Sequence, residues 1–192
     1  ISTPFSKKAA ERLNKFGVPA FKIGSGECNN YDLIKYICQF KKPIILSTGM
    51  NNIYSINKKV DIIKRFNVPL ALLHCVNLYP TPFKLLRLNS IQEMKKCFKD
   101  IVIGFSDHTI GIDAAIAATA LGAKIVEKHY VDSKKIKGPD ISCSMDRYEL
   151  KKLIDISNKI SSALPGKKEP LKEEKVTIKF AFASLVAKRD IK

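Results

Sequence analysis

The sequence predicts a parallel α/β fold. Five short runs of Ile, Val, Leu and Phe recur between residues 20 and 126, without alternating with polar residues. Continuous apolar runs of this kind are typical of strands buried on both faces, as in a parallel sheet. Segments with helical signals separate the runs, which gives repeated β–α units. The predicted strands are Ala20–Gly24, Pro43–Leu46, Pro69–Leu73, Ile101–Phe105 and Lys124–Val126.

Capping residues and apolar spacing predict the helices. Ser6 is a suitable N-cap for the first of them. The next two repeat apolar residues at intervals of three and four, and the Ala-rich fourth stops at Gly122, which suits the position after a helix end. Asp146 followed by Glu149 predicts a capping box at the start of the last. The predicted helices are Lys7–Phe16, Tyr31–Phe40, Ser55–Phe66, Ile112–Leu121 and Arg147–Ala163.

The composition changes after Pro165-Gly166. Lys167–Lys175 is a charged linker interrupted by Pro170. The following segment, Thr177–Ile191, predicts one or two strands of a separate element.

The chain is strongly basic, with 34 Lys and Arg residues against 18 Asp and Glu residues and a net charge of +16. The excess is spread along the chain, mostly as Lys pairs on predicted helix surfaces. Arg is scarce, and no aromatic residues alternate with a basic stripe as a base-stacking surface requires. We therefore expect no specific binding of nucleic acid, and we expect the Lys-rich surface to attract anionic substrates.

Several features predict a cytoplasmic protein. The 5 Cys residues form no C-x-x-C pair, which indicates reduced thiols, and Cys38 and Cys75 are interpreted as core residues. No apolar run approaches the roughly 20 residues of a membrane span, so we expect no membrane insertion. The start, Ile1–Ser6, has no features of a signal peptide and lacks an initiator Met, so we interpret it as an internal start.

Two histidines, His108 and His129, each follow an apolar run. On neighbouring strands about 4.8 Å apart, both imidazoles converge on one edge of the sheet. Two protein nitrogens leave other positions to water and substrate oxygens, which suits Mn²⁺ or Mg²⁺; the alternative is that each histidine only bonds a loop. Asp107 and Glu127 precede the histidines and are candidates for orienting them. His74 is flanked by apolar residues and is interpreted as buried.

Hydroxyl groups, glycines and one lysine gather at the predicted carboxyl ends of the strands. Glycines allow the backbone to approach an anion closely, hydroxyls donate hydrogen bonds, and Lys22 adds a fixed positive charge. This set predicts a phosphate or carboxylate site, although Ser-Thr-Gly at 47–49 is also an ordinary turn sequence. The hydroxyl residues are Thr3, Ser25, Ser47 and Ser106.

Two carboxylates and two neutral polar residues complete the predicted site. Glu27 ends the Lys-Ile-Gly-Ser-Gly-Glu run of the first predicted strand and would face the same mouth. Asp140 follows a Gly-Pro pair on a loop that we expect to fold back over the site, the alternative being an Asx turn. Either carboxylate can orient a polyhydroxyl substrate or handle a proton. Asn77 and Tyr79 add hydrogen-bonding groups from a Pro-rich loop.

These motifs together resemble the sialic acid synthase family, and within it the bacterial N-acetylneuraminate synthases. The resemblance covers essentially the whole chain, and the spacing between motifs fits without large gaps. The residues that carry it are Ser2–Ser6, Lys22–Glu27, Ser47–Met50, Leu73–Pro82, Ile103–Thr109, Glu127–Tyr130, Gly138–Met145 and Phe180–Ala187.

The resemblance implies a (β/α)₈ TIM barrel followed by a small antifreeze-like (SAF) domain. In the family, that domain reaches over the site of a partner subunit in a domain-swapped homodimer. Residues 1–164 would then be an incomplete TIM barrel with about strands 3–8, residues 165–179 a linker, and residues 180–192 the start of the SAF domain.

The family condenses phosphoenolpyruvate with N-acetylmannosamine and water, and releases N-acetylneuraminate and phosphate. On this resemblance His108 and His129 would bind Mn²⁺ or Mg²⁺. Glu27 and Asp140 would be the catalytic carboxylates that face the sugar and its aldehyde. The residues that would hold phosphoenolpyruvate are Thr3, Lys22, Ser25, Ser47, Asn77, Tyr79 and Ser106.

Alternative functions remain at this point. Legionaminate and pseudaminate synthases share the scaffold, and Gly24–Glu27 with Gly138–Ile141 favours the neuraminate or legionaminate branch. An inactive remnant, or half of a split protein, is the alternative from a different class. Since five complete strands cannot close an eight-stranded barrel, we expect the isolated chain to be poorly stable and inactive.

Overall fold

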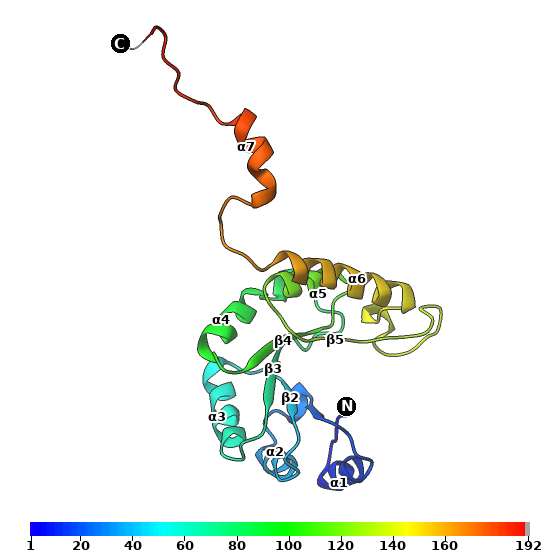
Figure 1. Cartoon of the computed structure of the whole chain (residues 1–192). Coiled ribbons are helices and arrows are strands. Elements are labelled where there is room, and N and C mark those ends of the chain that lie inside the picture. The colour runs from blue at the N-terminus through cyan, green and yellow to red at the C-terminus, as the bar shows by residue number, and fades with distance from the viewer. Residues whose placement is uncertain (191–192) are drawn as a thin grey trace.

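Five parallel strands form one curled sheet in the computed structural model, which describes residues 1–190 (Figure 1). They lie side by side in chain order, so that every connection leads to the next neighbour. This confirms the predicted parallel α/β architecture. The strands are β1 (Phe21–Ile23), β2 (Ile44–Ser47), β3 (Leu70–Cys75), β4 (Val102–Asp107) and β5 (Val126–Lys128).

Helices connect the strands and cover the outer side of the sheet (Figure 1). None of the helices in residues 1–190 is long and apolar enough to cross a membrane. The α-helices are α1 (Lys7–Lys15), α2 (Tyr31–Cys38), α3 (Ile53–Lys64), α4 (Asn89–Cys97), α5 (Asp113–Ala120), α6 (Arg147–Ala163) and α7 (Lys175–Ala181). Short 3-10 turns occupy Ser25–Glu27, Phe83–Leu85, Ile141–Cys143 and Lys172–Glu174.

The curl of the sheet brings its first and last strands together. Flat strands about 4.8 Å apart would hold β1 and β5 about 19 Å from each other. Instead, Lys22 Nζ on β1 lies 3.3 Å from Glu127 Oε2 on β5. The sheet is therefore an incomplete barrel whose concave side is narrow enough for one ion pair to span it.

Strand register decides which residues face the concave side. Cys75 pairs with Ser106, and Ser106 pairs with Glu127, so these three side chains form one layer. Ser47 pairs with Leu73, and alternation along β3 puts both on the same face as Cys75. The concave face thus becomes polar at the carboxyl ends of the strands.

The main apolar core lies between the convex face of the sheet and the helices. Phe21, Leu46, Leu72 and Phe105 alternate with the concave residues and are buried. They pack with apolar side chains from the helix faces, which are Leu33, Ile34, Ile37, Ile56, Val60, Ile63, Ile91, Met94, Ala114 and Ala118. Helix packing on this side leaves the opposite side of the sheet available for polar groups.

The local helix signals are confirmed. Ser6 Oγ accepts a hydrogen bond from Ala9 N at the start of α1. Asp146 and Glu149 form the capping box of α6, which spans the predicted range. Gly122 follows Leu121, the C-cap of α5, and has φ +89°, a conformation that other residues rarely adopt.

The element boundaries differ from the predictions where tertiary pairing decides them. Each strand starts one or two residues later than its apolar run, and β3, β4 and β5 continue into polar residues that pair with a neighbour. Helix α4 was not predicted, because it buries only Ile91 and Met94 and its remaining surface is polar.

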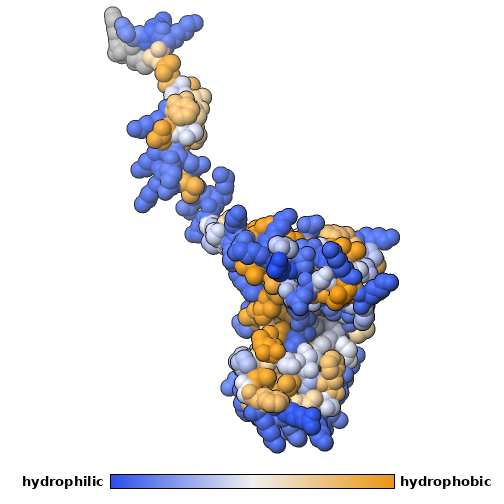
Figure 2. All heavy atoms as spheres, turned by 90° about the vertical axis from the view of Figure 1, so that its right-hand side faces the viewer, coloured by the Kyte–Doolittle hydropathy of each residue, from blue (hydrophilic) through white to orange (hydrophobic). Residues whose placement is uncertain are grey.

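The predicted strands of Thr177–Ile191 are wrong for their first part, because α7 occupies Lys175–Ala181. No strand follows up to Asp190, and Ile191 and Lys192 lie outside the described residues. This tail projects away from the barrel (Figure 1) and carries exposed apolar side chains (Figure 2), which are Leu171, Val176, Phe180, Phe182, Leu185 and Val186. The predicted SAF domain start at 180–192 stays a prediction.

Candidate functional site

The polar layer of the concave face is held together by Glu127. Its Oε2 pairs with Lys22 Nζ at 3.3 Å, and its Oε1 accepts a hydrogen bond of 2.8 Å from Ser106 Oγ. Lys22 is almost fully buried and also donates to the Ile23 carbonyl at 3.3 Å. A lysine in this position supplies a fixed positive charge at the bottom of the mouth.

The two histidines predicted from the strand ends lie together above this layer. The ring centroids of His108 and His129 are 5.4 Å apart, with an interplanar angle of 71°. Tyr79 covers both, at 4.1 Å from the His108 ring and 5.7 Å from the His129 ring. Three predicted residues from separate loops therefore form one cluster.

Backbone hydrogen bonds fix this cluster. His108 Nδ1 lies 2.9 Å from the Val76 carbonyl oxygen, which can only accept, so Nδ1 carries the hydrogen. Thr81 N donates to the His108 carbonyl at 2.9 Å, and the Thr81 hydroxyl bonds carbonyls of its own loop. The loop that carries Tyr79 is thereby fastened to the end of β4.

Burial controls the protonation of two members of the cluster. Burial lowers the pKa of His108, and the neighbouring His129 lowers it further, while the Val76 carbonyl raises it. Burial also raises the pKa of the Tyr79 hydroxyl. His108 is therefore neutral near pH 7, and Tyr79 keeps its proton as a hydrogen-bond donor.

Asp140 reaches the cluster on a loop that folds back, as predicted. Its Oδ2 lies 3.9 Å from His129 Nδ1. Met145 N donates to the His129 carbonyl, which fastens the far end of the loop beside β5. Asp140 has φ +61°, and its carbonyl accepts the Ser144 hydroxyl at 2.8 Å. The loop geometry thus holds the carboxylate at the histidine pair.

Ser25 and Asn77 meet at Gly49, on the β2 side of the mouth. Ser25 Oγ accepts a hydrogen bond from Gly49 N at 3.0 Å. A Cβ at Gly49 would lie 2.0 Å from Asn77 Oδ1 and 2.8 Å from Ser25 Oγ, so only glycine allows this approach. Cys75 Sγ donates to Asn77 Oδ1 at 3.1 Å.

The other predicted residues occupy the rim. Ser47 ends β2, and its buried Oγ has no hydrogen-bond partner among the described residues. Glu27 ends the 3-10 turn after β1, where its Oε2 accepts from Asn30 Nδ2 at 2.7 Å. Thr3 lies beside β1 through the Ser2–Phe21 bridge. Among the described residues, neither Thr3 nor Glu27 is hydrogen-bonded to His108 or His129.

Sequence reasoning missed two parts of this arrangement. Glu127 contacts Lys22 and Ser106, and no hydrogen bond joins it to a histidine, which was its predicted partner. Cys75 is buried as predicted, but it lies at the mouth among polar groups. The period-two alternation of β3 and β5 was the available signal, since it places both residues on the concave face. The prediction for His74 is confirmed, because it is buried and its Nε2 lies 2.7 Å from the Leu86 carbonyl.

The histidine pair fits a divalent cation with two protein ligands. Because His108 Nδ1–H is engaged by a carbonyl, its Nε2 lone pair is free for a metal, the arrangement usual for ligating histidines. Among the described residues, no group of three or more His, Cys, Asp and Glu side chains is placed to hold an ion. Ligands beyond the two imidazoles would therefore come from water or substrate.

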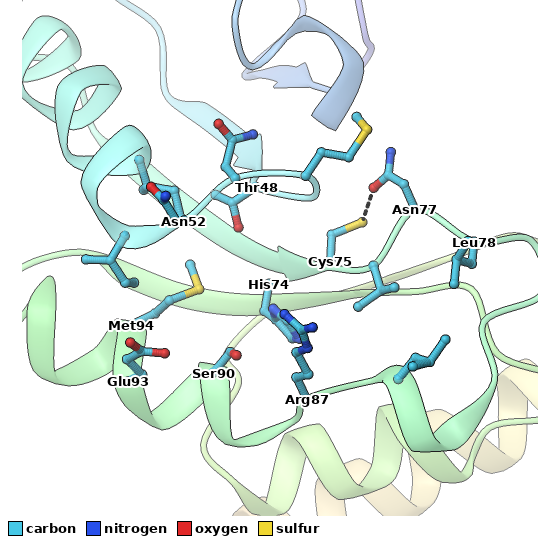
Figure 3. A pocket seen from close by; sticks show the side chains of 16 residues that line it. Thr48, Asn52, His74, Cys75, Asn77, Leu78, Arg87, Ser90, Glu93 and Met94 are labelled. Atoms are coloured by element: carbon cyan, nitrogen blue, oxygen red, sulfur yellow. Dashed lines mark hydrogen bonds between the residues drawn. The ribbon is translucent and has the colours of Figure 1, made fainter.

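A cavity adjoins this mouth and does not contain the histidine pair. It has a volume of about 700 Å³ and lies between α3 and α4, over the end of β3 (Figure 3). Cys75 and Asn77, joined by the hydrogen bond drawn there, form its wall toward the mouth, and Arg87 and Glu93 lie on its other side. We take the histidine cluster as the candidate site because its polar groups converge.

Comparisons with known proteins agree with the geometry. The model of the NeuB family matches residues 1–169. The N,N'-diacetyllegionaminic acid synthase of Campylobacter jejuni is 41% identical over 198 residues, which cover 100% of this chain and 58% of that protein. An uncharacterized protein of Methanocaldococcus jannaschii, MJ1065, is 41% identical over 100% of this chain and 57% of its own length. The chain thus spans little more than half of these relatives.

Solved structures give the same result for the fold. An N-acetylneuraminic acid synthetase from Leptospira borgpetersenii, in complex with citrate, superposes with a TM-score of 0.88 at 35% identity. The match covers 93% of this chain and 62% of that one. A DAHP synthase from Thermotoga maritima has a TM-score of 0.72 at 17% identity, over 84% of this chain and 50% of its own, which is a likeness of fold alone.

Proposed function

The chain belongs to the NeuB family, and from this premise we propose that it forms the catalytic mouth of an N-acetylneuraminate synthase. The reaction condenses phosphoenolpyruvate with N-acetylmannosamine and water, and it releases phosphate. The observation that carries the proposal is the convergence of His108, His129 and Tyr79 above the buried pair of Lys22 and Glu127. This arrangement combines a site for a cation with a site for an anion.

His108 and His129 would hold Mn²⁺ or Mg²⁺ through their free ring nitrogens. A bound ion of this kind would supply Lewis-acid polarisation of the sugar carbonyl. Burial keeps His108 neutral, so its lone pair is available without loss of a proton.

Phosphoenolpyruvate would bind at the polar layer beneath the histidines. Lys22 supplies positive charge there, and Ser106 and Ser25 supply hydroxyls on either side. The buried Ser47 hydroxyl, which has no partner among residues 1–190, would donate to the same anion. Thr3, Asn77 and Tyr79 would complete its contacts. The Glu127 carboxylate already pairs with Lys22, so it lowers the net positive charge that the anion would meet.

The two catalytic carboxylates would act on the sugar side. Asp140, beside His129, is placed to accept a hydrogen bond from the sugar near its aldehyde. Glu27 would act as general base or acid for the proton of the water that adds to the former enol carbon. In this reaction the methylene carbon of phosphoenolpyruvate bonds to the aldehyde carbon, water adds to the neighbouring carbon, and its C–O bond to phosphate breaks.

A legionaminate or pseudaminate precursor is the second candidate substrate. The 41% identity to the C. jejuni N,N'-diacetyllegionaminic acid synthase favours it, and a C. jejuni pseudaminic acid synthase is 38% identical. These acceptors would present the same open-chain aldehyde and differ from N-acetylmannosamine elsewhere in the sugar. The chemistry at the histidine pair would be unchanged.

In the complete protein, we propose that the exposed apolar tail leads into an SAF domain that covers the mouth of a partner subunit. Phe180 and Phe182 are exposed here and would gain a surface to pack on. The assembly would then be a domain-swapped homodimer in the cytoplasm.

Phosphate release by the complete protein tests the function. The protein is incubated with phosphoenolpyruvate, Mn²⁺ and either N-acetylmannosamine or its 2,4-diacetamido-6-deoxy analogue. The mass of the product is then measured by mass spectrometry. We expect acceptor-dependent phosphate release, a nine-carbon 2-keto acid, and loss of both in His108→Ala and His129→Ala. Asp155→Asn, on the exposed face of α6, is the control that should keep activity. Phosphate release that does not depend on an acceptor would contradict the proposal.

A further inference from the structure

Behind the histidine pair, Asp107 and Lys128 form an ion pair that solvent does not reach. Lys128 Nζ lies 2.9 Å from Asp107 Oδ2, and both side chains are 0% exposed. The same Nζ donates to the Thr109 carbonyl at 2.7 Å. The other carboxylate oxygen of Asp107 accepts from Thr109 N at 2.8 Å. Both charges are therefore paired and hydrogen-bonded within the protein.

The position of this pair in the sheet relates it to the histidines. Asp107 and Lys128 are register partners on β4 and β5, and each directly precedes one histidine. Because side chains alternate along a strand, the ion pair lies on the convex side while the histidines lie on the concave side. The bonds to Thr109 N and O also fix the backbone that follows His108.

We propose that Asp107 and Lys128 are positioning residues that set the separation of His108 and His129 for a divalent cation. The proposal rests on the proposed function, since it assigns the pair a role toward the same metal. Three charge-assisted bonds join Asp107, Thr109 and Lys128. Asp107 and Thr109 flank His108, and Lys128 precedes His129. Rotation or sliding of β5 against β4 would break the two bonds that Lys128 makes.

A contribution to stability alone does not account for the geometry. A buried ion pair often contributes no more to folding than two apolar side chains of equal volume, because desolvation offsets the attraction. Its hydrogen bonds are directional, however, and fix a register that apolar contacts leave adjustable. Residues behind metal ligands typically change metal affinity 10–100-fold when they are replaced.

The test measures Mn²⁺ affinity from the electron paramagnetic resonance signal of free Mn²⁺, on the complete protein and below every melting midpoint. Asp107→Asn removes one charge and keeps the shape, whereas the double variant Asp107→Asn, Lys128→Met removes both. Thermal unfolding of each variant is recorded in parallel. The control is Asp155→Asn, which opens an exposed ion pair on α6.

We expect Asp107→Asn to bind Mn²⁺ at least tenfold more weakly and to melt lower than the parent. The double variant should regain most of the melting midpoint and still bind Mn²⁺ at least tenfold more weakly, while Asp155→Asn changes neither. A double variant within twofold of the parent affinity would overturn the positioning role. A parent protein that binds no Mn²⁺, or binds it equally after His108→Ala, would overturn the metal site itself and the positioning role with it.

Discussion

The ion pair between Lys22 and Glu127 provides a direct test of how the concave face is held. Glu127→Gln removes the carboxylate charge with almost no change of shape, and the amide oxygen can still accept from Ser106. Lys22 then remains 8% exposed with the Ile23 carbonyl as its hydrogen-bond acceptor. A buried cation without a counter-charge is costly, so we expect the folded state to lose free energy.

The size of the loss follows from the geometry. Two unit charges 3.3 Å apart attract by about 5 kcal/mol at an effective dielectric constant of 20 and by about 1 kcal/mol in water. The Glu127 side chain is 40% exposed and the Lys22 side chain 10%, so solvent screens the pair from one side. We expect a loss of about 2 kcal/mol, roughly a 30-fold change in the folding equilibrium constant.

Urea unfolding followed by circular dichroism measures this loss. The parent, Glu127→Gln, Lys22→Met and the double variant form a double-mutant cycle, in which we expect a coupling energy of about 2 kcal/mol. Asp155→Asn breaks a more exposed pair and should change stability by at most about 1 kcal/mol. A coupling energy near zero for Lys22 and Glu127 would refute the reasoning.

Three further predictions concern packing and thiols. Gly104→Ala should lower the free energy of unfolding by about 1–3 kcal/mol in urea melts, because its Cβ would lie 2.5 Å from the Ile125 carbonyl oxygen; Gly26→Ala, with nothing within 4 Å, should have a smaller effect. Burial raises the pKa of Cys38 from 9.0 to about 11, so the thiol ionises first in the unfolded chain, and the free energy of unfolding should fall between pH 9 and 11. An equally steep fall of the free energy of unfolding with pH in Cys38→Ala would contradict this. Dithionitrobenzoate should react rapidly with Cys97 alone, the one exposed cysteine, and with the other four after denaturation; rapid reaction of a second thiol would show that a buried site opens.

Helix ends were predictable because their signals are local. The side chains of Ser6 and Asp146 bond to backbone groups within three residues, so neighbouring sequence contains both partners. The tail shows the limit of such reasoning. Its β-branched and aromatic residues favour strands, but no neighbouring strand pairs with residues 175–181, and an isolated segment forms the locally bonded helix instead.

Strand β5 ends differently from its prediction for a long-range reason. The apolar run stops at Val126, and two charged residues follow. They extend the strand because each pairs with an opposite charge on another strand. Glu127 pairs with Lys22 on β1, and Lys128 pairs with Asp107 on β4. No local pattern identifies such partners.

The candidate site was largely predictable from one rule of parallel sheets. Carboxyl ends of all the strands meet at one edge, so polar residues after apolar runs were expected to converge. The structure joins His108, His129, Tyr79 and Asp140 in this way. The rule does not identify which groups touch, because contacts across the barrel depend on how strongly the sheet curls.

The bridge between Lys22 and Glu127 also bears on how the chain folds. These residues lie on the first and last strands, so the whole sheet is in the sequence between them. Closing such a long loop is entropically unfavourable until the intervening β–α units are in place. We therefore expect the bridge to form after the rate-limiting step of folding, with a kinetic Φ-value near zero. Its loss should then accelerate unfolding and leave the folding rate almost unchanged.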